Sequence, residues 1–344
     1  MNNTFKKIVS VSLFSLMGAS AFAHAEEKVI NIYSARHYAT DEMMYQDFTK
    51  QTGITIKRLE LKDEALLERM RSEGARSPAD VVLLVDAARL ATAQQQGLFQ
   101  PVKSKVLASK VPAQFTGENG LWYAFSSRSR VIVYNKDNID PKQAQNYEDL
   151  AKPALKGKVC TRSGSHPYML SLMSSMISHL GEKGAESWAK GVVENMARSP
   201  KGGDTDQIRA VASGECGVAL TNSYYWVRLM NSDKPEDKEV VSKVGFIWPN
   251  QSNYGAHMNV SGAAVARFAP NKNNAVKFLE YLASDSAQKY FANGNNEWPT
   301  VPGVKVDNPA LDALGPFKQD VTPAKTLAAN TALSQQIMDR VGYK

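Results

Sequence analysis

The chain has 344 residues and a formal net charge of +7, with 41 Lys and Arg against 34 Asp and Glu. This length exceeds what one hydrophobic core usually serves, so we expect two domains. The positive charge is spread along the chain, whereas nucleic-acid binding would require a basic stripe, so we expect no nucleic-acid partner.

The first 25 residues have the layout of a cleaved secretory signal. Lys6 and Lys7 precede an apolar run at 8–23, and Ala23-His24-Ala25 matches the small-residue pattern of a cleavage site. The run is shorter than the roughly 20 residues that span a bilayer. We therefore expect cleavage after Ala25, a mature net charge of +5, and export to a Gram-negative periplasm without a stable membrane anchor.

Strands and helices alternate after this segment. Short runs rich in β-branched residues at 29–34, 54–61 and 79–86 predict strands. Apolar residues recur at helical spacing at 44–48 and 66–70, and the residues after the third strand are again helical. Three βα units in succession predict a parallel sheet covered by helices.

A second βα series follows and predicts a second α/β lobe. The segments near 123–134 and 255–267 read as extended chain that crosses from one lobe to the other. A two-lobed protein of this kind closes on its ligand by a hinge motion. The strands of this second half are expected at 131–135, 158–162, 217–220, 243–248 and 258–268, with two helices at 273–292.

Three strand-to-helix corners carry tyrosine. They are Tyr38 after the first strand, Tyr168 in the second lobe, and the consecutive pair Tyr224 and Tyr225. Open α/β sheets bind ligands at the carboxyl ends of their strands, so these side chains are expected to face one cleft. Successive helical residues point about 100° apart, so we expect the pair to share a ligand only if it precedes regular helix.

Several phenols facing one cleft indicate a hard, highly charged cation. Ferric iron prefers anionic oxygen and can deprotonate a phenol whose ordinary pKa is about 10. Four phenolates around a trivalent ion leave one excess negative charge, which helix N-termini and arginines can offset. The arginines expected to do so are Arg36, Arg128 and Arg228, whereas His166 and His257 have only weak cases as ligands.

The ordered segments SARHY, SPADVVLLVDAARL, CTRSGSHPY, ASGECGVALTNSYYWVRL and NNEWPTVPG resemble the periplasmic ferric iron-binding proteins of bacterial iron ABC importers, including the cyanobacterial type. The resemblance covers essentially the whole mature chain. It implies the two-lobed type II periplasmic-binding-protein fold, with a mixed α/β sheet in each lobe. It also implies an importer's permease and ATPase as partners, and a monomer.

Carried over motif by motif, the resemblance implies that Tyr38, Tyr168, Tyr224 and Tyr225 bind Fe(3+). The histidine before the first tyrosine is a ligand in some members and a bystander in others, so the role of His37 stays open. Arg128 is implied to lie behind the phenolates. Members that lack the first tyrosine use a carbonate or phosphate, so we expect no obligatory synergistic anion in this chain.

The remaining expectations concern cysteines, lobe boundaries and competing functions. Cys160 and Cys216 are the only cysteines, and in an oxidising compartment they suggest one disulfide. Competing functions are a binding protein of the same fold for thiamine, a polyamine or a phosphonate, a secreted hydrolase, and a structural surface protein. The sequence contains no nucleophile elbow, no HExxH motif and no phosphate loop, so we do not expect an enzyme. The lobes are expected at 26–127 plus 255–302 and at 128–254 plus 303–344.

Overall fold

The computed structural model describes residues 28–36 and 38–344. The predicted signal peptide, its cleavage site and His37 therefore lie outside the described residues. Within the described part of the chain, no helix is long and apolar enough to cross a membrane.

The first lobe is built on the predicted parallel strands. β1 (Val29–Ser34) lies between β2 (Thr55–Glu60) and β3 (Val81–Leu84), and both pairings are parallel. β9 (Met258–Ala266) then adds to β3 in the antiparallel direction, so the sheet is mixed. The other elements of this lobe are β4 (Phe99–Gln100), α1 (Asp41–Thr52), α2 (Asp63–Glu73), α3 (Ala87–Gln95), α4 (Lys105–Lys110), α9 (Lys272–Leu282) and α10 (Asp285–Lys289).

The second lobe has a smaller sheet and a longer helix. β6 (Val159–Cys160) lies parallel to β7 (Val218–Asn222), and the 28-residue α5 (Pro167–Glu194) changes direction at Gly181. α12 (Ala324–Arg340) packs against both α5 and α3, and so contacts both lobes. The remaining elements here are β8 (Val244–Ile247), α6 (Asp204–Ala212), α7 (Ser223–Met230), α8 (Pro235–Lys243) and α11 (Pro309–Asp312).

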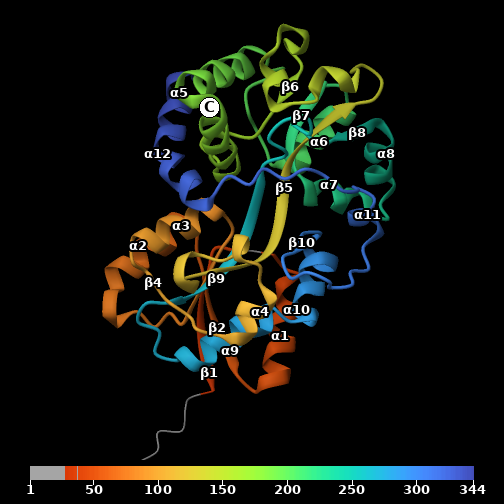
Figure 1. The fold of residues 1–344 in the computed structure, drawn as a ribbon. Coiled ribbons are helices and arrows are strands. Elements are labelled where there is room, and N and C mark those ends of the chain that lie inside the picture. The colour runs from red at the N-terminus through yellow and green to blue at the C-terminus, as the bar shows by residue number, and fades with distance from the viewer. Residues whose placement is uncertain (1–27, 37) are drawn as a thin grey trace, which may run out of the picture.

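One long strand belongs to both sheets. The first part of β5 (Tyr123–Asn135) pairs with β9 and with β10 (Trp298–Pro299), and its second part pairs with β7 and β8. Figure 1 shows β5 and β9 running side by side between the lobes. This confirms the two crossing segments. The polar run SSRSR inside β5 is buried, and its side chains bond to groups of both lobes, as Ser126 does to Glu297 and Arg130 to Asp204.

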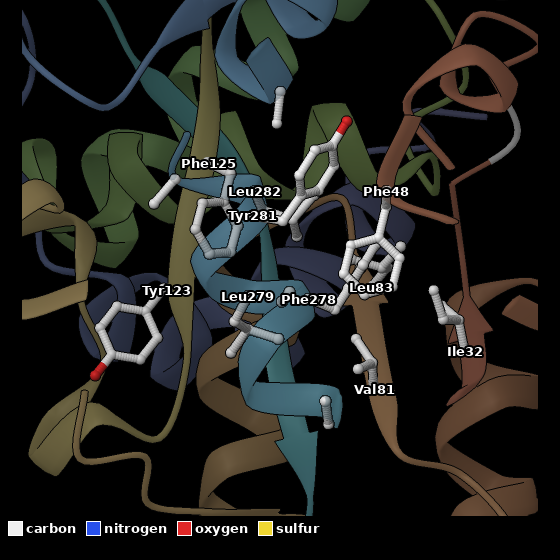
Figure 2. Close-up of a cluster of buried hydrophobic side chains, with 14 of the residues drawn as sticks. Ile32, Phe48, Val81, Leu83, Tyr123, Phe125, Phe278, Leu279, Tyr281 and Leu282 are labelled. Carbon is white, nitrogen blue, oxygen red and sulfur yellow. The ribbon is translucent and has the colours of Figure 1, made fainter. Parts of the chain in front are cut away.

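Separate hydrophobic clusters stabilise the lobes. In the first lobe, Phe48 of α1 meets Phe278 of α9 edge to face, with ring centroids 5.0 Å apart, beside Leu83 of β3 (Figure 2). In the second, Met173 and Trp188 of α5 pack with residues of β7. Leu327 of α12 also joins a cluster of the first lobe, in keeping with the contact of α12 with both lobes.

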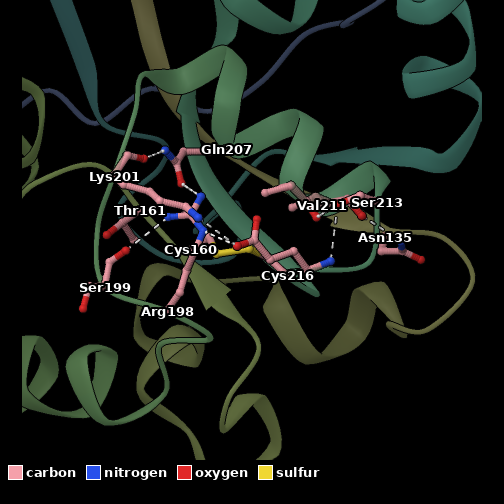
Figure 3. The surroundings of a disulfide bond; sticks show 12 residues. Asn135, Cys160, Thr161, Arg198, Ser199, Lys201, Gln207, Val211, Ser213 and Cys216 are labelled. Atoms are coloured by element: carbon pink, nitrogen blue, oxygen red, sulfur yellow. Dashed lines mark hydrogen bonds and ion pairs between the residues drawn. A yellow bond between two sulfur atoms is a disulfide. The ribbon is translucent and has the colours of Figure 1, made fainter.

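The predicted disulfide is confirmed. Cys160 of β6 is bonded to Cys216, which precedes β7, with Cα atoms 5.9 Å apart (Figure 3). Nearby, the Asn135 side chain donates to the Val211 carbonyl at 2.8 Å. The disulfide joins the end of β6 to the turn before β7. The helices that follow these two strands, α5 and α7, carry Tyr168 and Tyr224 as their second residues.

Candidate functional site

Tyrosines from both lobes meet at the boundary between them. The Tyr168 hydroxyl lies 3.1 Å from that of Tyr224, and the Tyr38 hydroxyl donates to Tyr224 at 3.4 Å. Tyr38 precedes α1 in the first lobe, whereas Tyr168 and Tyr224 are the second residues of α5 and α7 in the second lobe. We call these three residues the phenol cluster. Their oxygens converge because all three corners face the same gap between the sheets.

The fourth predicted tyrosine lies beside this cluster. The ring of Tyr225 packs on Tyr224 with centroids 4.2 Å apart and a tilt of 31°. The pair does not precede regular helix, because α7 begins at Ser223 and includes both residues in its first turn. In the first helical turn, Tyr224 is buried and Tyr225 is half-buried.

The environment keeps the phenols of the cluster protonated in the absence of a cation. Burial raises the pKa of all three above the ordinary value of 10, most strongly for Tyr168 and Tyr224. Mutual repulsion of the ionised oxygens adds to this effect for Tyr168 and Tyr224. A ligand that converts the phenols to phenolates must therefore supply positive charge at their oxygens.

Two buried arginines of the predicted set lie behind Tyr38. The guanidinium of Arg36 lies 4.6 Å from the Tyr38 ring centroid and pairs with Asp41 at 2.8 Å. Arg128 is 1% exposed and donates to the Ser261 hydroxyl at 2.9 Å and to the Val85 carbonyl. Both positive charges lower the pKa of Tyr38, against the stronger effect of burial. They therefore favour a phenolate at that position.

The second lobe supplies further arginines, two of which the sequence reasoning missed. The predicted Arg228 lies over the Tyr225 ring at 5.2 Å. Arg130 and Arg162 lie 5.9 and 5.1 Å from the Tyr168 ring centroid, and both pair with the buried Asp204. Arg130 lies two residues after Arg128 on β5, so the strand's period-2 alternation could have indicated it.

Glu297 is a third residue that the sequence reasoning missed. Its carboxylate is fully buried, accepts from the Ser126 hydroxyl at 2.6 Å and lies 3.6 Å from Arg36 and 3.9 Å from Arg128. Its negative charge raises the pKa of Tyr38. The residue stands within the quoted segment NNEWPTVPG, but only the fold brings it next to the two arginines.

The histidines have structural contacts. The Nδ1 of His166 accepts from the Tyr168 amide at 3.2 Å and so caps α5, while burial lowers its pKa to about 3. His257 is buried and bonds to Ser171 at 3.0 Å. Among residues 28–36 and 38–344, no group of three His, Cys, Asp or Glu side chains could hold a metal ion.

Comparison with known proteins establishes the family. Residues 43–320 match the family model of the bacterial extracellular solute-binding proteins. Iron uptake protein A1 of Synechocystis is 44% identical over all of this chain and 97% of its own length. The chain belongs to the ferric iron-binding branch of this family. The major ferric iron-binding protein of Neisseria meningitidis, at 29% identity over 92% of this chain and 93% of that protein, is a more distant relative.

Solved structures agree with this family and with the type II periplasmic-binding-protein fold. A Trichodesmium family member in complex with iron and citrate superposes with a TM-score of 0.85 at 49% identity, covering 92% of this chain and all of that one. The ferric binding protein of Campylobacter jejuni gives 0.87 at 41% identity with the same coverage. The fold expected from the sequence is therefore confirmed.

Proposed function

We propose that this protein captures ferric iron between its lobes through tyrosine phenolates. The observation that carries the proposal is the phenol cluster, in which oxygens from both lobes lie 3.1 and 3.4 Å apart. One ion placed among these oxygens would bond to both lobes and hold them closed. The relatives named for ferric iron binding and iron uptake support the choice of cargo.

The ligands in this proposal are Tyr38, Tyr168, Tyr224 and Tyr225. Although Tyr224 and Tyr225 both lie in the first turn of α7, their rings pack side by side, with centroids 4.2 Å apart, and so can approach one ion. Four phenolates with one ferric ion carry one net negative charge, and the surrounding arginines stabilise it. Because Tyr38 is present, no synergistic anion is obligatory. His37, outside the described residues, is the remaining candidate ligand.

The cellular setting completes the proposal. The signal peptide is cleaved after Ala25, and the mature protein acts as a monomer in the periplasm. It delivers iron to the permease and ATPase of an ABC importer, without enzymatic activity of its own. The lobes comprise 26–127 plus 255–302 and 128–254 plus 303–344, hinged at β5 and β9.

Visible absorption after iron loading tests this function. Phenolate-to-ferric charge transfer absorbs visible light, so protein loaded with ferric citrate and desalted should be coloured and contain one iron per chain. The Tyr224→Phe/Tyr225→Phe double variant should lose both colour and iron. A colourless wild type, or a double variant that retains iron, would refute the proposal.

A matched control separates ligand loss from a general effect of removing buried phenols. Tyr281 is also buried, and its hydroxyl bonds to Asp47 at 2.8 Å within the first lobe. The Tyr281→Phe variant should therefore keep full colour. Thermal melting of the iron-free proteins shows whether each variant is folded.

A further inference from the structure

Asn259 of β9 makes hydrogen bonds to both lobes. Its side-chain amide donates to the Asp86 carboxylate at 2.5 Å and to the Ser171 hydroxyl at 2.9 Å. The side-chain oxygen of Asn259 accepts from the backbone amide of Ala87 at 2.9 Å. Asp86 and Ala87 form the corner between β3 and α3 in the first lobe, whereas Ser171 belongs to α5 in the second.

The Ser171 end of this connection lies next to the phenol cluster. Ser171 follows Tyr168 by three residues, so both stand on the same face of the first turns of α5. A bond that fixes Ser171 against Asn259 therefore also fixes the position of Tyr168 relative to the first lobe. Tyr168 is the residue whose hydroxyl meets Tyr224 at 3.1 Å.

The bond between Asn259 and Ser171 is buried and compatible with the other bonds of both side chains. Asn259, Ser171 and His257 are 7%, 3% and 3% exposed, so water does not replace the bond easily. Burial lowers the pKa of His257 to about 4, so its ring is neutral at pH 7. The Nε2 atom, 3.0 Å from Ser171, can then accept the hydroxyl proton while the hydroxyl oxygen accepts from Asn259.

We propose that Asn259 is a positioning residue for iron retention, which joins the α5 turn carrying Tyr168 to the β3–α3 corner of the first lobe. The bond to Asp86 lies within the first lobe and persists when the lobes separate, whereas the bond to Ser171 breaks. The Asn259–Ser171 bond thus adds to the stability of the closed, iron-loaded form alone. This role rests on the proposed ferric iron binding.

Iron release tests the role. Wild-type and variant proteins are loaded with ferric citrate, desalted and mixed with excess EDTA, and the decay of the visible band gives the release rate. Loss of one buried hydrogen bond should make release from Asn259→Ala about tenfold faster. Ser171→Ala leaves the Asp86 bond intact but also removes the bond to His257, so it should accelerate release at least as much. The double variant should release no faster than Ser171→Ala alone, because both substitutions remove the Asn259–Ser171 bond.

A control and a folding check separate positioning from instability. Asn271 also bonds to an aspartate, Asp80, at 3.1 Å, but within the first lobe, so Asn271→Ala should release iron at the wild-type rate. If Asn259→Ala is unfolded without iron, Ser171→Ala alone carries the test.

Three results would overturn the inference. They are a wild-type release rate in Ser171→Ala, independent additive effects in the double variant, and equal acceleration in Asn271→Ala. A coloured wild type with such results overturns the positioning role alone. A wild type that takes up no iron overturns the proposed function as well.

Discussion

Replacing Tyr224 with Phe removes the phenol that bonds to both other members of the cluster. Burial raises the pKa of Tyr38, Tyr168 and Tyr224 above 10, so each is neutral at pH 7 and loses one proton when it binds ferric iron. With Tyr225, the proposed ligands release four protons, so the affinity should rise about 10,000-fold per pH unit, at about 1.4 kcal/mol for each proton. The Tyr224→Phe variant should release one proton fewer, and its affinity should rise only about 1000-fold per pH unit.

Proton release on iron binding measures this number directly. Ferric citrate is added to protein in weakly buffered solution at pH 7, and a pH indicator reports the protons released per iron bound. Hydrolysis of iron and protonation of citrate contribute equally for wild type and variant, so the difference between them counts the phenol protons alone. The expected difference is one.

The Tyr281→Phe variant provides the reference for this measurement, because its missing phenol is buried and bonds to Met44 and Asp47 rather than to the cluster. It should release as many protons as wild type. Equal proton release from wild type and Tyr224→Phe, with iron bound to both, would refute the assignment of Tyr224 as a phenolate ligand.

Three further predictions concern stability. The Cys160→Ala/Cys216→Ala variant should lose about 4 kcal/mol of unfolding free energy in guanidinium titration, because the bond joins residues 56 apart in sequence; wild-type stability would contradict this. Phe278→Ala should lose about 3–5 kcal/mol, since the ring is fully buried, yet leave the visible band of the loaded protein unchanged. The iron-free protein should melt at a nearly constant temperature between about pH 8 and pH 10 and at lower temperatures above it, because the raised phenol pKa values favour the folded state only while the phenols stay neutral. Melting temperatures that rise above pH 10 would contradict the last prediction.

The amino-acid sequence determines the local elements and the chemical type of the site. The β-branched runs at 29–34 and 79–86 form strands because they bury both faces, and the helices between them follow from apolar spacing. Tyrosine at three corners is visible without coordinates, since βα units place such corners at one edge of a sheet. Hence Tyr38, Tyr168 and Tyr224 could be predicted as a group.

Only the tertiary structure brings together groups that are distant in the chain. Glu297 lies between Arg36 and Arg128 because β10 pairs with β5, a contact that no local pattern encodes. Asn259 reaches Ser171 because β9 crosses from one lobe to the other. The phenols that reveal the site are thus readable from the corners, whereas the buried charges and the interlobe bonds depend on how the two sheets are packed.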